Sequence, residues 1–293
     1  MPFTESADGT RLYYEVNRAE TPQVDALLIH GFGEHCRRYD EFCDHLSERG
    51  VSTLRFDLRG HGRSDGRRGH ILSFSDYLDD VRAALSIFNE TFDAPLKLLI
   101  GHSNGSLIAT HIAAETQSAQ SWDGLVLSSP FFAIKVKVPA WKSFLGAKLS
   151  RWIPSLQLPT DLSPEVMSHD PGLVAAYGSD PLIGRVASAR WFTETLKAHD
   201  AVAGKLRETS TPMSLWQVAG DDHVADADVS TRLFDELATS RKTLKVYPEC
   251  YHEIWFEEER LRAPILRDLD QFLSELKMSQ EQVQSEQEPE GEG

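Results

Sequence analysis

The segment Leu96–Glu115, "LKLLIGHSNGSLIATHIAAE", places one serine between two glycines where an apolar run changes to a helical pattern. The run "LKLLI" is typical of a buried strand, and the residues after Ser103 predict a helix through about Thr116. In the pattern G-x-S-x-G, the glycines allow a cramped strand-to-helix turn that exposes the serine hydroxyl. The segment therefore predicts a nucleophile at a helix N-terminus, where free N–H groups favour negative charge. The alternative is a packing turn of small residues.

Strands and helices alternate on both sides of this segment. The other predicted strands are "RLYYEV", "DALLIH", "VSTLRFDL", "GLVLSS", "MSLWQVAG" and "LKVYP". Helices are expected over 74–91, near 229–239 and at the C-terminus, where the apolar stripe comprises Leu266, Leu269, Phe272, Leu273 and Leu276. This alternation predicts an α/β fold with a mostly parallel sheet covered by helices on both faces.

One region interrupts the alternation. No strand pattern is visible over 131–195, where Trp141, Phe144 and Trp152 fall at helical spacing. We expect a helical cap there, inserted into a core formed by 1–130 and 196–278. These aromatic side chains are expected to pack the cap onto the core; alternatively, they line an acyl channel or touch a lipid surface. Residues 279–293 are acidic and almost devoid of apolar side chains, which predicts a disordered tail.

Composition excludes several classes of protein. The chain of 293 residues is 41% hydrophobic and carries a formal net charge of −15, which disfavours nucleic acid and anionic lipid surfaces as partners. No apolar run is long enough to cross a bilayer, and the N-terminus lacks a secretory signal. The three cysteines, Cys36, Cys43 and Cys250, are expected to be free thiols. We therefore expect a cytoplasmic protein; its oligomeric state stays open.

The partners of a catalytic serine follow it in the order acid and then histidine. Five histidines follow Ser103: His111, His169, His199, His223 and His252. Only His252 follows the last predicted strand, on a loop before the final helix, which makes it the expected general base rather than a surface histidine. For the acid, "LWQVAGDDHVAD" offers Asp221, Asp222 and Asp226; we favour Asp222, with Asp221 in reserve, although both could simply cap the next helix.

An oxyanion formed at the substrate carbonyl needs two hydrogen-bond donors. The backbone N–H of Asn104 follows the nucleophile, and the loop "HGFGEH" offers the N–H of Phe32. The same loop together with His61 and His70 could suggest a metal site. The spacing fits no compact zinc pattern, however, so no metal is expected.

Several strings resemble one family: "HGFGEHCRRYDEF", "FDLRGHGRSDGRRGHILSFSDYLDDV", "GHSNGS", "GSDPLIG" and "YHEI". They resemble the monoacylglycerol lipase and lysophospholipase branch of the α/β-hydrolases, from about Arg11 to Leu276. The resemblance implies an α/β-hydrolase fold with a helical cap and no cofactor. It implies a serine hydrolase that cleaves monoacylglycerol or lysophospholipid through an acyl-enzyme. Ser103, Asp222 and His252 match the triad of that family, and Phe32 and Asn104 match its oxyanion-hole positions.

Other functions stay open at this stage. The family often has methionine and glycine where this chain has Asn104 and Ser106, so the polar Asn104 could alter the acyl site. The fold also serves carboxylesterases of other small esters, C–C hydrolases and perhydrolases, and a ligand-binding module with an idle triad is a further alternative. The expected partner is a small acyl ester, with at most transient membrane-surface contact through the cap.

Overall fold

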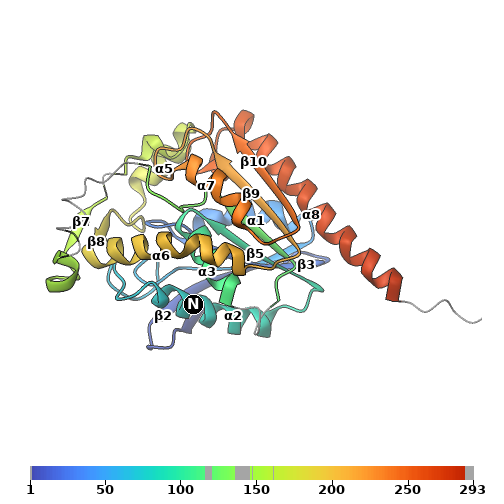
Figure 1. Ribbon diagram of the computed structural model, residues 1–293, viewed down its shortest axis with the longest axis horizontal. Coiled ribbons are helices and arrows are strands. Elements are labelled where there is room, and N and C mark those ends of the chain that lie inside the picture. The colour runs from blue at the N-terminus through green and yellow to red at the C-terminus, as the bar shows by residue number, and fades with distance from the viewer. Residues whose placement is uncertain (1, 116–120, 136–145, 147, 161, 288–293) are drawn as a thin grey trace, which may run out of the picture.

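The computed structural model describes residues 2–115, 121–135, 146, 148–160 and 162–287. Its centre is an eight-stranded sheet (Figure 1). The strands are β1 Phe3–Glu5, β2 Arg11–Asn17, β3 Val24–Ile29, β4 Val51–Phe56, β5 Leu96–His102, β6 Gly124–Ser128, β9 Met213–Ala219 and β10 Arg241–Tyr247. Their order is β1-β2-β4-β3-β5-β6-β9-β10. Among the pairs of this sheet, β1–β2 and β2–β4 are antiparallel and the other five are parallel, so the predicted mostly parallel sheet is confirmed.

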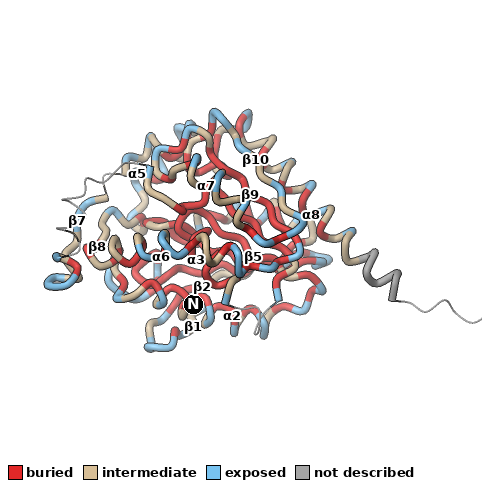
Figure 2. The backbone as a smooth tube through the Cα atoms, in the orientation of Figure 1, coloured by how far each residue is buried: buried red, intermediate tan, exposed pale blue. Residues whose placement is uncertain are grey.

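Helices cover both faces of the sheet. On one face lie α2 (Ser75–Thr91), α3 (Asn104–Glu115) and α6 (Ala189–Glu208), and on the other lie α1 (Asp40–Ser47) and α8 (Glu259–Gln287). Side chains alternate along each strand. In β3, for example, Leu27 and Leu28 belong to different apolar clusters. Figure 2 shows the buried strands running through the centre of the molecule.

The final helix is longer than the sequence predicts. Its expected stripe is buried at Leu269, Phe272, Leu273 and Leu276, and Leu266 packs partly buried against the same cluster. The helix continues to Gln287, whereas the disordered tail was expected from residue 279. Glutamate and glutamine favour helix, which accounts for the continuation of α8 beyond its apolar stripe. Residues 288–293 lie outside the described residues.

No described helix combines the length and the apolar character that a bilayer span requires.

The inserted cap lies between β6 and β9. It contains the 3-10 helix η3 (Pro164–Val166), the helix α5 (Pro171–Ser179) and a two-stranded antiparallel ribbon, β7 (Gln157–Pro159) with β8 (Val186–Ser188). The expectation of no strand in this region was wrong, because strands of three residues are too short to produce a periodic pattern.

The expected boundary between cap and core at 195/196 falls inside α6. This helix packs on the core through Trp191, Ala198, Val202 and Leu206, which belong to the same apolar cluster as α2 and α3. The helix expected near 229–239 is shorter than predicted: α7 covers Ala227–Leu233 and the 3-10 helix η4 covers Phe234–Glu236.

Candidate active site

The predicted site residues follow four different strands. Phe32 follows β3, Ser103 follows β5, Asp222 follows β9 and His252 follows β10. Because these strands are parallel, their carboxyl ends share one edge of the sheet, which is where open α/β sheets bind ligands. The topology therefore brings together residues that are far apart in sequence.

The turn at Ser103 is cramped, as the two glycines predicted. Ser103 has a φ of 53°, a left-handed conformation that is uncommon for a residue with a side chain. A Cβ atom on Gly105 would lie 2.1 Å from the carbonyl oxygen of Ile29, and one on Gly101 would lie 2.6 Å from that of Gly105. The N–H of Ser103 donates to the carbonyl of Ser128 at 2.9 Å, which fixes the turn to β6.

Hydrogen bonds join Ser103, His252 and Asp222 in a chain. The Oγ of Ser103 lies 2.8 Å from Nε2 of His252, and Nδ1 of His252 lies 2.7 Å from Oδ2 of Asp222. The other carboxylate oxygen of Asp222 accepts from the N–H groups of Val224 and Ala225 at 2.7 and 2.9 Å. The acid is thus held on both sides, in an orientation that selects one imidazole tautomer.

The alternative acids point elsewhere. The side chain of Asp221 is 59% exposed and forms a 3.7 Å ion pair with His223. Asp226 caps α7 by accepting from the N–H groups of Asp228 and Val229. Of the three aspartates, the structure places only Asp222 against His252.

The electrostatics of the site stabilise the ionised forms of His252 and Asp222 relative to ordinary exposed side chains. Burial opposes ionisation of Asp222, but the charge and hydrogen bond of His252, with two backbone N–H donors, hold its pKa below the usual value. Burial also opposes protonation of His252, but Asp222 outweighs it and raises the pKa of His252. The neighbouring His102 has its pKa lowered to about 3 by burial and by the charge of His252. His102 therefore stays neutral and does not compete as a base.

The two predicted oxyanion donors flank Ser103. Asn104 begins α3, so its N–H has no acceptor within the helix. Phe32 follows Gly31, on which a Cβ atom would lie 3.0 Å from the Cβ of Ser103. The loop of Phe32 therefore passes close to Ser103, the predicted nucleophile. The side chain of Asn104 is buried and is absent from the described cavity lining, so the structure does not support the expected effect of Asn104 on the acyl site.

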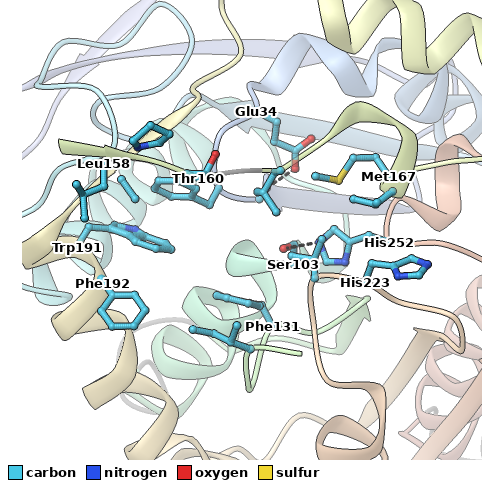
Figure 3. Close-up of a pocket in the computed structure, with 18 of the residues that line it drawn as sticks. Glu34, Ser103, Phe131, Leu158, Thr160, Met167, Trp191, Phe192, His223 and His252 are labelled. Atoms are coloured by element: carbon cyan, nitrogen blue, oxygen red, sulfur yellow. Dashed lines mark hydrogen bonds between the residues drawn. The ribbon is translucent and has the colours of Figure 1, made fainter. Parts of the chain in front are cut away.

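A cavity of about 620 Å³ opens over Ser103. Its size lies in the range of ligand pockets, and its wall is mostly apolar. Figure 3 shows Leu158, Trp191 and Phe192 on one side of Ser103, and Met167 and His223 on the other, beside His252. The apolar side chains described in its wall include Phe32, Phe131, Ile134, Leu149, Leu158, Val166, Met167, Tyr177, Trp191, Phe192 and Val224.

The charged side chains in one wall of the cavity had no predicted role. Glu34 and Glu253 line it, and Arg38 lies between them. The signal was present, because all three residues belong to "HGFGEHCRRY" and "YHEI". Nothing in either string indicated that they would meet.

The remaining histidines have other partners. His111 joins α3 to α6 through the carbonyl of Ala198, and His169 bonds to Glu257. His61, proposed above as part of a possible metal cluster, has its pKa lowered to about 3 by burial and the neighbouring His30. Within the described ranges, no three His, Cys, Asp or Glu residues are grouped in a way that could hold a metal ion.

The aromatic stripe of the cap is only partly described. Trp141 and Phe144 lie outside the described residues, while Lys148–Trp152 is helical. Leu149 from this stretch lines the cavity, but the Trp152 side chain is 78% exposed. The expectation that Trp152 packs the cap onto the core was therefore wrong.

Comparison with known proteins gives consistent matches. The family model Hydrolase_4, described as serine aminopeptidase S33, matches residues 21–259. Phospholipase YtpA of Bacillus subtilis (strain 168) is 31% identical over 244 residues, covering 83% of this chain and 93% of that protein. Monoglyceride lipase of Mus musculus is 29% identical over 278 residues, covering 94% and 90%. The crystal structure of a monoacylglycerol lipase from Paleococcus ferrophilus is similar with a TM-score of 0.80 and 28% identity, covering 90% of this chain and 99% of that one.

Proposed function

The chain belongs to the Hydrolase_4 family of serine hydrolases with the α/β-hydrolase fold, and from this premise we propose that it cleaves single-chain acyl esters at Ser103. One observation carries the assignment of the site. The Ser103 Oγ, 2.8 Å from His252 Nε2, lies at a mostly apolar cavity, and His252 in turn contacts Asp222. A base within hydrogen-bond distance can take the serine proton as the hydroxyl attacks.

The proposed reaction is a two-step acyl transfer. The Oγ of Ser103 attacks the ester carbonyl carbon, and its proton passes to Nε2 of His252. The N–H groups of Phe32 and Asn104 hold the resulting oxyanion. Collapse of this intermediate expels the alcohol, which takes the proton from His252. Water, deprotonated by His252, then releases the fatty acid and restores the serine.

The two ends of the cavity suit the two parts of such a substrate. The end with Leu158, Trp191 and Phe192 suits the acyl chain, because each buried CH₂ contributes about 0.8 kcal/mol. The other end presents the polar groups of Glu34, His223 and Glu253 beside His252, where the leaving alcohol would accept its proton. This arrangement supports a small polar head group on a single acyl chain, as in the named activities of the mouse and Paleococcus relatives.

The family description also names aminopeptidase activity. An aminopeptidase must bind the substrate ammonium group, and a carboxylate with free lone pairs would serve. Glu34 and Glu253, the carboxylates of the cavity wall, are already bonded to Arg38. The geometry therefore favours ester over peptide substrates.

A substrate panel tests this proposal. We expect kcat/KM to rise with acyl length from a short p-nitrophenyl ester to a long-chain monoacylglycerol, since each added CH₂ gains burial worth up to about fourfold in kcat/KM. Comparison of monoacylglycerols with lysophospholipids in the same panel shows which head group is preferred. A diacyl lipid and an amino-acid p-nitroanilide should be poor substrates. No dependence on acyl length, or preferred cleavage of the anilide, would overturn the proposal. Failure of every ester would favour C–C hydrolysis or perhydrolysis.

We further propose transient contact of the cap with lipid surfaces. Trp152, Ile153 and Leu158 are 78%, 52% and 52% exposed, and Leu158 also lines the cavity. Replacement of Trp152 by Ser should raise KM for monoacylglycerol in neutral phosphatidylcholine vesicles by roughly 3- to 10-fold, because about half of an indole burial is lost. KM for a monomeric short ester should not change. The exposed Met278 on α8, replaced by Ser, is the control, and equal behaviour of the two variants on vesicles would exclude contact through Trp152.

The described cysteines support a reducing compartment. Cys36, Cys43 and Cys250 are all free and buried, so the fold contains no disulfide among them. We propose a cytoplasmic location on this basis, and recovery of the protein in the secreted fraction of its native cells would contradict it.

A further inference from the structure

One arginine joins two loops of the active site. The guanidinium of Arg38, in the 3-10 helix η1 (Cys36–Tyr39), donates to both carboxylate oxygens of Glu253 at 2.5 and 2.7 Å. The same guanidinium donates to Glu34 at 3.0 Å. Glu253 directly follows the base His252, and Glu34 lies two residues after Phe32. Arg38 thus links the loop of the general base to the loop of an oxyanion donor.

The second oxygen of Glu34 continues this link to the backbone. It accepts from the N–H of Gly31 and from the hydroxyl of Tyr39, the latter at 2.8 Å. The bond to Gly31 holds the peptide between His30 and Gly31, which directly precedes the peptide that carries the N–H of Phe32. Because Phe32 is the proposed oxyanion donor, Glu34 constrains the path of the chain into that donor.

The network is enclosed by the cap as well as by the core. The side chains of Arg38, Glu34 and Glu253 are 8%, 4% and 4% exposed. The guanidinium carbon of Arg38 lies 5.0 Å from the ring centre of Tyr177 in α5 and 5.4 Å from that of Phe256. The N–H of Glu253 donates to the carbonyl of Met167, also in the cap, at 2.8 Å.

Stability alone does not account for such a network. A buried ion pair can often be replaced by apolar side chains without loss of stability, because desolvation opposes the attraction of the charges. A planar guanidinium in two-point contact with a carboxylate does, however, define both distance and angle. Both carboxylates also line the cavity beside Ser103 and His252. Their placement points to a role in the geometry of the reaction.

We propose that Arg38 is a positioning residue: by binding Glu253 and Glu34 together, it holds the loops of His252 and Phe32 in the relative placement that acyl transfer from Ser103 requires. This inference rests on the proposed function. It predicts that the shape of the guanidinium matters as well as its charge.

The charge of Arg38 should also tune the base. The charged and titratable groups around His252 are Asp222, His102, Glu34, Arg38, Glu253 and, across the cavity, His223. Arg38 offsets one of the two carboxylates in the wall. Its loss leaves more negative charge facing His252, which favours the imidazolium, whereas loss of Glu253 has the opposite effect.

The test uses the full chain and a short soluble ester. Arg38→Lys keeps the charge but loses the two-point contact, so kcat should fall roughly 10- to 100-fold while KM changes less than about threefold. At low pH, kcat/KM should fall as His252 becomes protonated, and this fall is the acid limb of the pH profile. Arg38→Met should move the acid limb to higher pH by roughly 0.5 to 1 unit, and Glu253→Gln should move it to lower pH by a similar amount. Opposite shifts are not expected from general damage to the fold.

Arg59→Lys is the matched control. Arg59 forms a comparable buried pair with Asp80 at 2.6 Å, and neither residue lines the cavity. This variant should lose stability yet keep the parent's kcat and acid limb. If Arg38→Lys behaves like Arg59→Lys, or if the Met and Gln variants shift the limb in the same direction, Arg38 is structural only. If Arg38→Met does not fold, the Lys and Gln variants still decide. Full activity of Ser103→Ala would instead refute the proposed function itself.

Discussion

Replacement of Ser103 by Ala should lower kcat for p-nitrophenyl esters by about 10⁴- to 10⁶-fold, the range seen when a catalytic triad loses its nucleophile. In the proposed reaction, the serine hydroxyl supplies the atom that attacks the ester, and Nε2 of His252, the proposed base, lies 2.8 Å from it. Without the hydroxyl, the cavity and the oxyanion donors remain, so some residual hydrolysis by water is expected.

The fold of this variant should be intact. Alanine shares the backbone preferences of serine at φ 53°, and the side chain of Ser103 forms a hydrogen bond to His252, which also keeps its bond to Asp222 in the variant. The free energy of unfolding, measured with denaturant, should therefore change by about 1 kcal/mol or less. Ser214→Ala is the control, since Ser214 is also buried but bonds to the carbonyl of Leu125 within the sheet. Equal hydrolysis by the Ser103 variant and its parent would refute the assignment.

Replacement of Asp222 by Asn should lower kcat by roughly 10³- to 10⁴-fold while the fold is retained. Asp222 accepts from Nδ1 of His252 at 2.7 Å, which leaves Nε2 free to take the serine proton. An amide can present its NH₂ group to Nδ1 instead, and the imidazole then carries its proton on the wrong nitrogen.

The pH dependence gives this variant a second readout. Despite the opposing effect of burial, Asp222 raises the pKa of His252. A base must be neutral to act, so kcat/KM of the parent should fall as the pH drops and His252 becomes protonated. The midpoint of this fall, the acid limb, should lie above the ordinary pKa of histidine. Without the negative charge, the limb of Asp222→Asn should move to lower pH.

The adjacent aspartate provides the matched control. Asp221→Asn changes a side chain that is 59% exposed and makes no contact with His252 among those described. This variant should keep both kcat and the position of the acid limb. If Asp221→Asn is the inactive variant and Asp222→Asn is active, the acid has been assigned to the wrong residue.

The sequence was most informative where chemistry and strand ends coincide. Ser103 and Asp222 each follow a buried strand, and His252 follows the edge strand β10. A parallel sheet brings such positions to one edge whatever their separation along the chain. The choice of Asp222 over Asp221 could not be derived with the same force. It depends on which carboxylate faces the imidazole, and that direction is set by the loop bonds to Val224 and Ala225.

The sequence was least informative where structure depends on distant partners. Arg38 and Glu253 are 215 positions apart, and no local pattern signals their contact. The ribbon of β7 and β8 is held by pairing across the cap and is too short to produce its own periodicity. The C-terminal extension of α8 shows the opposite case, in which local helix preference continues after the apolar stripe has ended.

The central claim is that Ser103 is an activated nucleophile, and covalent labelling tests it most directly. The full chain is treated with a fluorophosphonate probe at neutral pH, digested and mapped by mass spectrometry. We predict one stoichiometric adduct on Ser103, absent from Ser103→Ala and formed much more slowly in Asp222→Asn. An adduct on another residue, or an unlabelled Ser103 in folded protein, would contradict the account.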